Sequence, residues 1–584
     1  MKQNIEALIK SALNQLQVKG ELPEIKSVIQ VESTKDKKHG DYASNIAMVL
    51  AKEAKKKPRD IAELVISNLP ASPFVEKAEI AGPGFINFFL TPGAMTGVVE
   101  KILTEKENYG RSKMGREKKV LIEFLSANPN GPLHVGHGRG AAFGDVVSRL
   151  LEAVGFKTYR EYYVNDAGRQ MDILTSSIWL RYLSLCGEQI VFPVNGYRGD
   201  YVIDIAKILL ADHNKKFHFD AKQIFAGLPP DETEGGDKEI YIDEIISRTK
   251  KHLGENYQTV FNAGLNNVLA DIKNDLAEFG VHYDNWFSER EFVSTDVVDK
   301  LLDTLTHGGH VYKKDGALWF RSTDFNDEKD RVLVRSNGTR TYFANDVAYH
   351  LSKFERGFDI AIDIFGADHH GYVPRMKASM EASEINPERL QHVLLQFVTL
   401  YRNGAQVQMS TRSGLFVTLR ELREEVGNDA ARFFYVMRKA DQHIDFDLDL
   451  AKSQSNENPV YYVQYAYARI CSVFKQMSER NIQFDENIGI MHANLLAEPE
   501  EQALLTTLSR YSDVITSAAL NYEPQLLTNY LRELAADFHA YYNSHQFLVE
   551  NADLRNARLA LITATKQTLL NGFNMLHITA PETM

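Results

Sequence analysis

The feature that most constrains the fold of this chain is a strand-to-helix signal at residues 120–156. An apolar run over residues 120–125 (VLIEFL) has the length and composition of a buried strand. Turn-forming residues follow at 128–132 (NPNGP), so a loop is expected there. Apolar side chains then recur at helical spacing over residues 143–154, and Gly155 stands where a helix C-cap is expected. The segment predicts a buried strand that turns through a short loop into a helix.

Two histidines, His134 and His137, stand at the expected start of this helix. The amino end of a helix presents unpaired backbone N–H groups and the positive end of the helix dipole, so it favours phosphate. Gly136 and Gly138 would let a flat ligand approach the backbone closely. Histidines at this spacing can equally ligate a metal or cap the helix, and the pair alone does not decide between these uses. The chain has neither the GxGxxG dinucleotide fingerprint nor a P-loop, which disfavours a nicotinamide cofactor and P-loop chemistry.

The pattern of apolar runs along the 584 residues predicts several domains. Residues 42–69 read as a helical stretch and residues 81–90 as a strand. The expected parts are an α+β N-terminal domain at 1–110, a Rossmann-like parallel α/β domain at 111–415 with helical insertions at about 170–330, a connecting region at 416–455 and an all-α domain at 456–584.

Composition narrows the class of protein. The hydrophobic content of 44% is ordinary for a globular protein, and no apolar run approaches the length of a membrane span. Two cysteines, Cys186 and Cys471, are too few for a disulfide framework or a cysteine-based zinc site, so the cytoplasm is expected. The net charge of −12 argues against nonspecific nucleic-acid binding. Basic residues concentrate at 35–45 and 51–60, where they form either a solvated helix face or a phosphate-contacting surface.

A second polar segment lies far downstream, at residues 407–419 (VQMSTRSGLFVTL). It follows an apolar stretch and precedes a helix expected to start near Thr418. Taken alone, it is an ordinary surface turn.

Together the two segments resemble the class I aminoacyl-tRNA synthetases. HVGH, which closes the motif running from Ala127 to His137, is similar to the HIGH motif, and QMSTR at 408–412 is similar to a divergent KMSKS loop. Within that class the chain resembles the arginyl-tRNA synthetases along nearly its whole length. The matching stretches are HGDYASNIAMVLAK, AGPGFINFFL, EFLSANPNGPLHVGHGRG, YYVNDAGRQ, TRTYFANDVAYH, FGADHHGYVPR, NPVYYVQYAYAR and APETM.

The resemblance implies that ATP and L-arginine form arginyl-adenylate and that the arginyl group then passes to tRNA(Arg). In this family the first step usually requires bound tRNA. Mg²⁺ is expected with ATP, without a cage of protein ligands, and no zinc is expected. The residues implied for catalysis or ATP binding are His134, Gly136, His137, Gly138, Asp368, His369, Met409, Ser410 and Arg412.

For arginine the resemblance implies a carboxylate clamp on the guanidinium at Asp346. Tyr342 and Glu123 would lie beside it, and Asn128 would hold the backbone end of the amino acid. The resemblance also implies arginine binding by His370, which stands where many relatives carry glutamine. The structural alternative for Asp346 is an N-cap of a helix beginning at Val347.

The KMSKS-like loop departs from the family pattern. Gln408 and Thr411 replace both lysines, so the usual mobile cations are missing. Arg412 is the nearest remaining cation, and either it approaches the phosphates as the loop closes or it pairs with a neighbouring acid.

The C-terminal region carries a row of tyrosines beside an arginine. The resemblance implies tRNA binding by Tyr461, Tyr465 and Arg469, because aromatic rings and arginine stack on unpaired bases. Helical spacing also suits core packing for some of these rings. Tyr467 departs from a histidine that is frequent in relatives. The chain is expected to act as a monomer.

Three rival functions stay open from the residues. A nucleotidylyltransferase uses HxGH on a similar sheet but needs no helical domain. A metal-dependent hydrolase would combine His134 and His137 with Asp368, His369 and His370. A tRNA-binding paralogue without activity would explain the lysine-poor loop.

Overall fold

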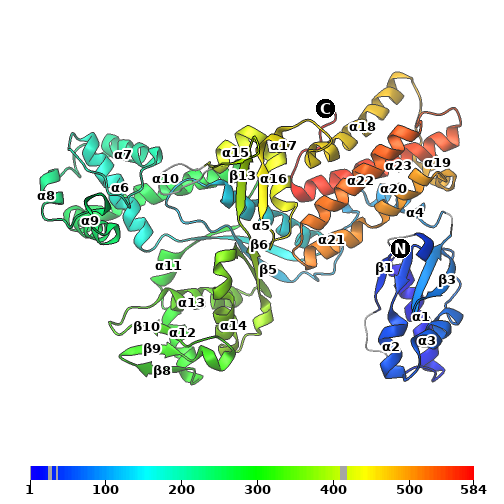
Figure 1. Ribbon diagram of the computed structural model, residues 1–584, viewed down its shortest axis with the longest axis horizontal. Coiled ribbons are helices and arrows are strands. Elements are labelled where there is room, and N and C mark those ends of the chain that lie inside the picture. Colours follow the sequence, from blue (N-terminus) through cyan, green and yellow to red (C-terminus); the bar gives the residue numbers. More distant parts are fainter. Residues whose placement is uncertain (1, 24–28, 35–36, 92, 408–416) are drawn as a thin grey trace.

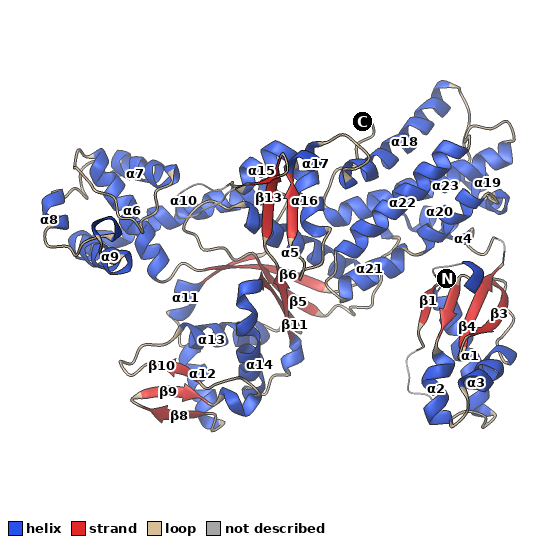
Figure 2. Cartoon of the chain, in the orientation of Figure 1, coloured by secondary structure: helices blue, strands red, loops and turns tan. Residues whose placement is uncertain are grey.

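A five-stranded, fully parallel sheet stands at the centre of the chain (Figure 1, Figure 2). The computed structural model describes residues 2–23, 29–34, 37–91, 93–407 and 417–584. The strand order is β12-β11-β5-β6-β7. The strands are β5 (Lys119–Phe124), β6 (Lys157–Val164), β7 (Asn285–Ser288), β11 (Ile360–Gly366) and β12 (Leu390–Leu395). With helices packed on this sheet, the predicted Rossmann-like α/β class is confirmed.

The order of the strands places a topological switch point at one edge of the sheet, and we call the region outside it the crevice. β5 comes first in sequence yet lies third in the sheet, with β6 and β7 on one side and β11 and β12 on the other. Connections leaving β5 and β11 therefore diverge at the carboxyl ends of these two strands. Such a switch point is where open parallel sheets bind ligands.

Helix α5 (Val135–Ala153) follows β5 and packs against the sheet. Its apolar residues are buried, as their helical spacing predicts, and Gly155 adopts the left-handed conformation with φ +90° just after its C-cap residue, Val154. Gly144 lets this helix approach β5 closely, because a Cβ at that position would overlap the ring of Phe124. The predicted strand–loop–helix unit is thus present.

Two insertions leave the sheet. The first, between β6 and β7, forms a helical lobe at the left of Figure 1. Its helices are α6 (Arg169–Leu185), α7 (Asp200–His213), α8 (Ala221–Phe225), α9 (Lys238–Leu253) and α10 (Tyr257–Glu278), with 3-10 turns η3 (Glu232–Glu234) and η4 (Gly254–Asn256).

The second insertion, between β7 and β11, has a core of its own. It comprises α11 (Glu289–Val293), α12 (Val297–His307), the antiparallel strands β8 (Val311–Lys314), β9 (Ala317–Phe320) and β10 (Arg331–Val334), η5 (Ser322–Phe325) and α13 (Tyr342–Glu355). Strand β7 returns to the central sheet between the two insertions. Sequence patterns did not predict this return, because β7 has only four residues, all half-buried.

The connection between β11 and β12 contains η6 (Ala367–Tyr372), α14 (Val373–Ala382) and η7 (Pro387–Arg389). After β12 the chain forms a small connecting unit. It contains β13 (Val398–Arg402), β14 (Ala405–Gln406), α15 (Leu419–Val426), α16 (Asn428–Val436), β15 (Ile444–Asp447) and α17 (Leu448–Lys452). β15 pairs in parallel with β13, and residues 408–416 lie between these two strands in the sequence.

The C-terminal part is helical, as predicted. Its helices are α18 (Pro459–Glu479), α19 (Glu486–Met491), α20 (Pro499–Ser509), α21 (Tyr511–Leu520), α22 (Gln525–Ser544) and α23 (Ala552–Leu576), with η8 (Ala493–Leu495). Helix α4 (Gly97–Glu105) and η2 (Lys106–Asn108), which precede β5, pack on α23. The Tyr109 hydroxyl donates to the Leu508 carbonyl at 2.7 Å.

The N-terminal domain is a separate α+β unit at the right of Figure 1. Its antiparallel sheet has the order β1-β2-β4-β3. The elements are α1 (Lys2–Val18), β1 (Val31–Ser33), η1 (Lys37–His39), β2 (Tyr42–Ser44), α2 (Ile46–Ala54), α3 (Pro58–Ser67), β3 (Val75–Ala81) and β4 (Phe85–Leu90).

The single helical stretch expected over 42–69 is wrong. The segment begins with strand β2 and then forms two helices, because Lys55 closes α2 in the left-handed conformation and Pro58 starts α3. The exposed lysines of 52–57 lie at this break.

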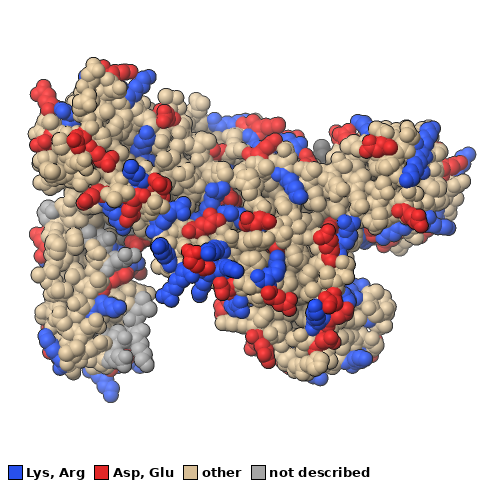
Figure 3. Space-filling model, turned by 180° about the vertical axis from the view of Figure 1, so that it is seen from behind, with Lys and Arg blue, Asp and Glu red and all other residues tan. Residues whose placement is uncertain are grey.

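Basic and acidic side chains are interspersed on the face shown in Figure 3, and Lys and Arg gather near its middle, beside the N-terminal domain. Among the described residues, no helix combines the length and apolar character needed to cross a membrane.

Candidate active site

The histidine pair lies at the start of α5, at the carboxyl edge of β5. His134 is the N-cap residue, and its Nδ1 accepts from the Gly136 backbone N–H at 3.1 Å. The Nδ1 atom of His137 accepts from the His134 backbone N–H at 3.2 Å. The two rings stack with centroids 3.6 Å apart. The pair thus fulfils the helix-capping function, while its rings stay at the phosphate-friendly helix end.

Both rings are neutral near pH 7. Burial lowers the pKa of His134, and burial together with the neighbouring His134 lowers the pKa of His137 well below its usual range. Since each Nδ1 accepts a backbone hydrogen, each neutral ring carries its proton on Nε2. The site therefore has two imidazole N–H donors at the end of a helix.

The turn after β5 is made by two residues in the left-handed region. Leu125 has φ 68° and Ser126 φ 42°, and neither is glycine. Such backbone costs energy and persists only where its surroundings hold it. The Ser126 hydroxyl donates to Glu123 Oε1 at 3.1 Å and accepts from the Tyr163 backbone N–H at 3.1 Å. This turn directs the chain toward Asn128 and the histidines.

Beneath the crevice, three acids lie in register on neighbouring strands. Glu123 of β5 pairs with Asp363 of β11 on one side and with Glu161 of β6 on the other, and all three are buried. Like charges at such positions repel unless cations lie between them. The sequence patterns did not predict this cluster, because it depends on the register of three strands.

Helix α13 supplies the compensating groups. The buried Lys353 ammonium donates to Glu123 Oε2 at 2.7 Å and to Asp363 Oδ1 at 2.6 Å. The Tyr349 hydroxyl lies 2.9 Å from both Glu123 and Glu161. Burial alone would raise the pKa of Asp363, but the charges of Lys353 and His350 outweigh it and hold that pKa well below its usual range.

A second pair of acids, Asp346 and Glu289, forms no salt bridge with a lysine or arginine among the residues that the structure describes, although the charge of Arg375 acts to lower the pKa of Asp346. Asp346, one turn before His350 on α13, has its pKa raised to about 6 by burial, although His350 and a hydrogen bond from Tyr372 oppose the shift. Glu289, at the start of α11, has its pKa raised to about 7 by burial and by the charges of Asp346 and Asp166. The two carboxyls therefore form an acidic site with little access to solvent, and a cation bound there would stabilise their ionised forms.

Glu289 was not among the predicted residues. It is 4% exposed and follows Ser288, the last residue of β7. With its amide nitrogen turned toward Glu289, Asn165 donates to Glu289 Oε2 at 2.8 Å and lies 3.1 Å from the amide of Asn128. A Ser–Glu pair after an aromatic run is the sole sequence signal for this residue, and it is a weak one.

The other residues expected to bind arginine lie around this acidic pair. Asp346 is inside α13, whose N-cap is Thr341, so the alternative of an N-cap at Asp346 is wrong. Tyr342 is 64% exposed and precedes Asp346 by one turn, and its hydroxyl lies over Gly168. Asn128 is half-buried in the loop after β5. The helix and the strand ends thus bring the predicted residues to one edge of the sheet.

Asp368, His369 and His370 occupy η6, directly after β11, and all three are exposed. His369 Nε2 lies 3.8 Å from Asp368 Oδ2. Across the described parts of the chain, one cluster has the geometry of a metal site, namely Glu123, His350 and Asp363. Lys353 already places a cation there. Neither His134 nor His137 belongs to a metal cluster within this part of the chain, so the geometry gives no support to the metal-hydrolase alternative.

The predicted residues Met409, Ser410 and Arg412 lie outside the described residues, as do Gln408 and Thr411. The helix expected near Thr418 is present: Thr418 caps α15 in a capping box with Glu421. Residues 417–419 pair with the histidine segment, because the Leu419 N–H donates to the Leu133 carbonyl at 2.8 Å and the Val135 N–H to the Val417 carbonyl at 3.1 Å. The segment that leads into α15 thus lies beside the start of α5.

On α18, the tyrosines separate into two groups. Tyr467 is 5% exposed and packs on Phe573. Tyr461 and Tyr465 are half-buried and stack on each other with centroids 5.8 Å apart. The Arg469 guanidinium lies 4.4 Å from the centre of the Tyr465 ring. An aromatic and cationic surface is therefore available beside the core tyrosine.

A parallel sheet with a histidine pair at the helix after its central strand, paired with the residues that lead into α15, has the features of a class I aminoacyl-tRNA synthetase. Residues 98–446 match the family of tRNA synthetases class I (R), catalytic domain. Residues 3–90 match the arginyl tRNA synthetase N terminal domain, and residues 463–584 the DALR anticodon binding domain. The chain belongs to the arginyl-tRNA synthetase family, which confirms the resemblance seen in its motifs.

Individual relatives agree with this assignment. The chain is 58% identical to the arginine–tRNA ligase of Thioalkalivibrio sulfidiphilus and 53% identical to that of Hydrogenovibrio crunogenus, with 100% of each chain covered. Among solved structures, it is similar to a putative arginyl-tRNA synthetase from Campylobacter jejuni with a TM-score of 0.73 at 31% identity, covering 85% of this chain and 100% of that one.

Proposed function

We propose that the crevice at β5 and β11 performs both half-reactions of the family. As an arginine–tRNA ligase, the enzyme joins L-arginine to tRNA(Arg) through an arginyl-adenylate, at the expense of ATP. The observation that carries the proposal is the acidic pair, Asp346 and Glu289, on the same sheet edge as the histidine-capped start of α5. One pocket suits a guanidinium and the other suits phosphate, as the reaction requires.

Arginine binds with its guanidinium between Asp346 and Glu289. Bidentate donors such as guanidinium match two carboxylates, while a lysine ammonium presents a point charge without the planar fork. Tyr342 and His370 close the side of the pocket, and Asn128 holds the amino-acid backbone. Glu123 acts from below, with its charge shared by Lys353 and Tyr349.

ATP binds across the start of α5. The Nε2–H groups of His134 and His137 donate to phosphate oxygens, and Gly136 and Gly138 leave room for the adenosine. Asp368 and His369 face the nucleotide from η6, and Met409, Ser410 and Arg412 act from the KMSKS-like loop.

The α-carboxylate of arginine attacks the α-phosphorus in line and pyrophosphate leaves. The protein therefore contributes mainly position and charge stabilisation. Mg²⁺ would accompany ATP as part of the substrate complex and would neutralise phosphate charge, and we expect no cage of protein ligands for it.

The remaining parts of the chain serve tRNA binding. We assign tRNA contact to residues 1–110, catalysis to 111–415, connection to 416–455 and anticodon binding to 456–584. Tyr461, Tyr465 and Arg469 would stack on unpaired bases of the anticodon loop. The enzyme is proposed to act as a cytoplasmic monomer without zinc, in keeping with its place in translation.

Replacing Asp346 by alanine tests the arginine site. Loss of a carboxylate partner for a charged group costs about 3–5 kcal/mol when it is buried, so kcat/KM for arginine should fall at least 100-fold. ATP–pyrophosphate exchange with tRNA present measures this, and the melting temperature serves as a folding control. An unchanged KM for arginine would remove Asp346 from the pocket.

Charging of total tRNA with each of the twenty amino acids tests the reaction itself, and charging by arginine alone is expected.

A further inference from the structure

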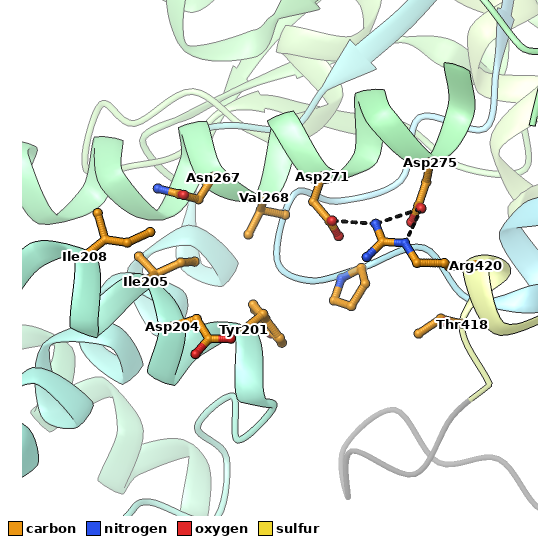
Figure 4. Close-up of a pocket in the computed structure, with 11 residues that line it drawn as sticks. Tyr201, Asp204, Ile205, Ile208, Asn267, Val268, Asp271, Asp275, Thr418 and Arg420 are labelled. Carbon is orange, nitrogen blue, oxygen red and sulfur yellow. Dashed lines mark hydrogen bonds and ion pairs between the residues drawn. The ribbon is translucent and has the colours of Figure 1, made fainter. Parts of the chain in front are cut away.

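Ion pairs connect the helical insertion to the helix that follows the KMSKS-like loop. Arg420 of α15 donates through Nη2 to Asp271 at 2.6 Å and through Nε to Asp275 at 2.8 Å (Figure 4). One turn further on, Arg423 Nη2 lies 2.5 Å from Glu278. Asp271, Asp275 and Glu278 share one face of α10, since they are spaced by four and three residues. We call these five residues the α10–α15 ladder.

Asp275 is the buried centre of the ladder. It is 1% exposed, and its Oδ2 has no hydrogen-bond partner within the described structure. Burial raises the pKa of Asp275, while the hydrogen bond and charge of Arg420 oppose the shift. Arg423 Nη2 lies 3.6 Å from Asp275 Oδ1, too far for a hydrogen bond, so loss of Arg420 leaves this buried carboxylate with only a distant cation.

Beside the ladder, the two helices are separated by a hollow. A cavity of 340 Å³ is lined by residues of α7, α10 and α15, and by Pro132 from the loop that leads to the histidines (Figure 4). Beside this hollow the ladder joins the two helices through ion pairs. On its other side α15 buries Leu419 and Leu422 and packs on α5, α16 and α17.

The start of α15 is in turn bonded to the histidine segment. Thr418 pairs across from His134, and hydrogen bonds on both sides of this pair join residues 417–419 to 133–135. Arg420 lies two residues beyond Thr418. A displacement of α15 would thus be passed directly to His134.

We propose that Arg420 is a positioning residue for adenylate formation. By binding Asp271 and Asp275 it holds the start of α15, and through the pairing of 417–419 with 133–135 it holds His134 in place for the ATP phosphates. This inference rests on the proposed contact of His134 with ATP. It makes the insertion helix α10 part of the framework that sets the rate of the first half-reaction, while the arginine pocket lies on other elements.

Arg420→Met is the principal test, with ATP–pyrophosphate exchange measured in the presence of tRNA. The expected result is a kcat at least 10-fold lower with a KM for arginine within two-fold of the unchanged enzyme. Arg420→Lys keeps the charge but cannot reach both acids as a planar fork, so an intermediate kcat is expected. Arg331→Met is the matched control, because Arg331 binds the equally buried Asp327 far from α15, and it should lower the melting temperature while leaving kcat within two-fold.

A double variant separates position from stability. Asp275→Asn added to Arg420→Met removes the orphaned charge and should recover the melting temperature but not kcat. Recovery of kcat together with stability would overturn the proposal, as would a kcat within two-fold in Arg420→Met. His134→Ala is assayed in parallel: full activity in that variant would refute the proposed ATP contact, whereas the Arg420 series would still report whether the ladder matters.

Discussion

At the scale of single residues, Asp346 and Glu289 lower the stability of the ligand-free protein near neutral pH. Their folded pKa values, about 6 and about 7, lie above those of ordinary carboxyls, so ionising them near neutral pH opposes folding. A guanidinium bound between them would remove that penalty. The proposed arginine site should therefore become more stable when the substrate binds.

The pH dependence of kcat/KM for arginine follows from these values. Guanidinium stays charged at every working pH, whereas a protonated carboxyl loses its attraction for it. Therefore kcat/KM should be highest above pH 8 and should fall as the pH is lowered through about 7 and then about 6. Burial lowers the pKa values of both histidines, so neither ring contributes to the step near pH 7.

Glu289→Gln is the diagnostic variant for this prediction. It should remove the upper step from the profile and raise the melting temperature of the ligand-free enzyme at pH 8. A profile with the same upper step in Glu289→Gln would assign that step to another group.

At the scale of elements, the helix start with its two histidines depends on how closely α5 lies on β5. Gly144 permits that approach, since any side chain there would overlap Phe124. This close approach is a property of how α5 and β5 pack together, and it does not depend on one contact alone.

Gly144→Ala should therefore destabilise the enzyme. Overpacking a core contact typically costs about 1–3 kcal/mol, and a shifted α5 would carry His134 and His137 with it. Thermal unfolding and pyrophosphate exchange should both be impaired. Gly140→Ala is a suitable control, because its Cβ would meet Leu125 at ordinary contact distances of 3.6 Å or more. Equal effects of the two substitutions would argue against close packing as the cause.

Elements were predictable where their signals are local. The run of residues 120–125, the turn formers and the spacing of 143–154 each specify structure within a few residues, so α5 and its histidines were found. Strand β7 was not predicted, because its four residues form a strand only by pairing with β6, more than a hundred residues earlier in the sequence. Glu289 follows β7 and was missed with it. The cluster around Lys353 was missed because it depends on strand register.

At the scale of the whole molecule, the two sites proposed for chemistry and for tRNA recognition lie on different parts of the chain. The candidate active site lies at an edge of the central sheet, whereas α18 belongs to the C-terminal helical part (Figure 1). Arg469 is held between Tyr465, at 4.4 Å, and Tyr542, at 4.7 Å, from ring centres to guanidinium carbon. Tyr461 stacks on the Tyr465 ring as well, so these side chains form one half-buried aromatic and cationic cluster.

Tyr465→Ala should weaken tRNA binding without affecting arginine. Stacking of one base is worth about 1–3 kcal/mol, so the KM for tRNA should rise roughly 5- to 150-fold while the KM for arginine stays unchanged. Tyr467→Phe is the control, as that ring is buried against Phe573 and should leave tRNA binding intact. A normal KM for tRNA in Tyr465→Ala would place the anticodon loop elsewhere.

The packing of α4 on α23 has a consequence for how the protein is made. Asn571 of α23 donates to the Lys106 carbonyl at 2.8 Å, and Tyr109 stacks on Tyr511. The apolar side of α4, with Val99, Ile102 and Leu103, is thus covered by residues synthesised more than four hundred positions later. During translation the apolar side of α4 is therefore not covered by α23 until α23 has left the ribosome. A chain that ends early would expose this apolar side next to a catalytic sheet that is already synthesised, and exposed apolar surface favours binding by chaperones or aggregation.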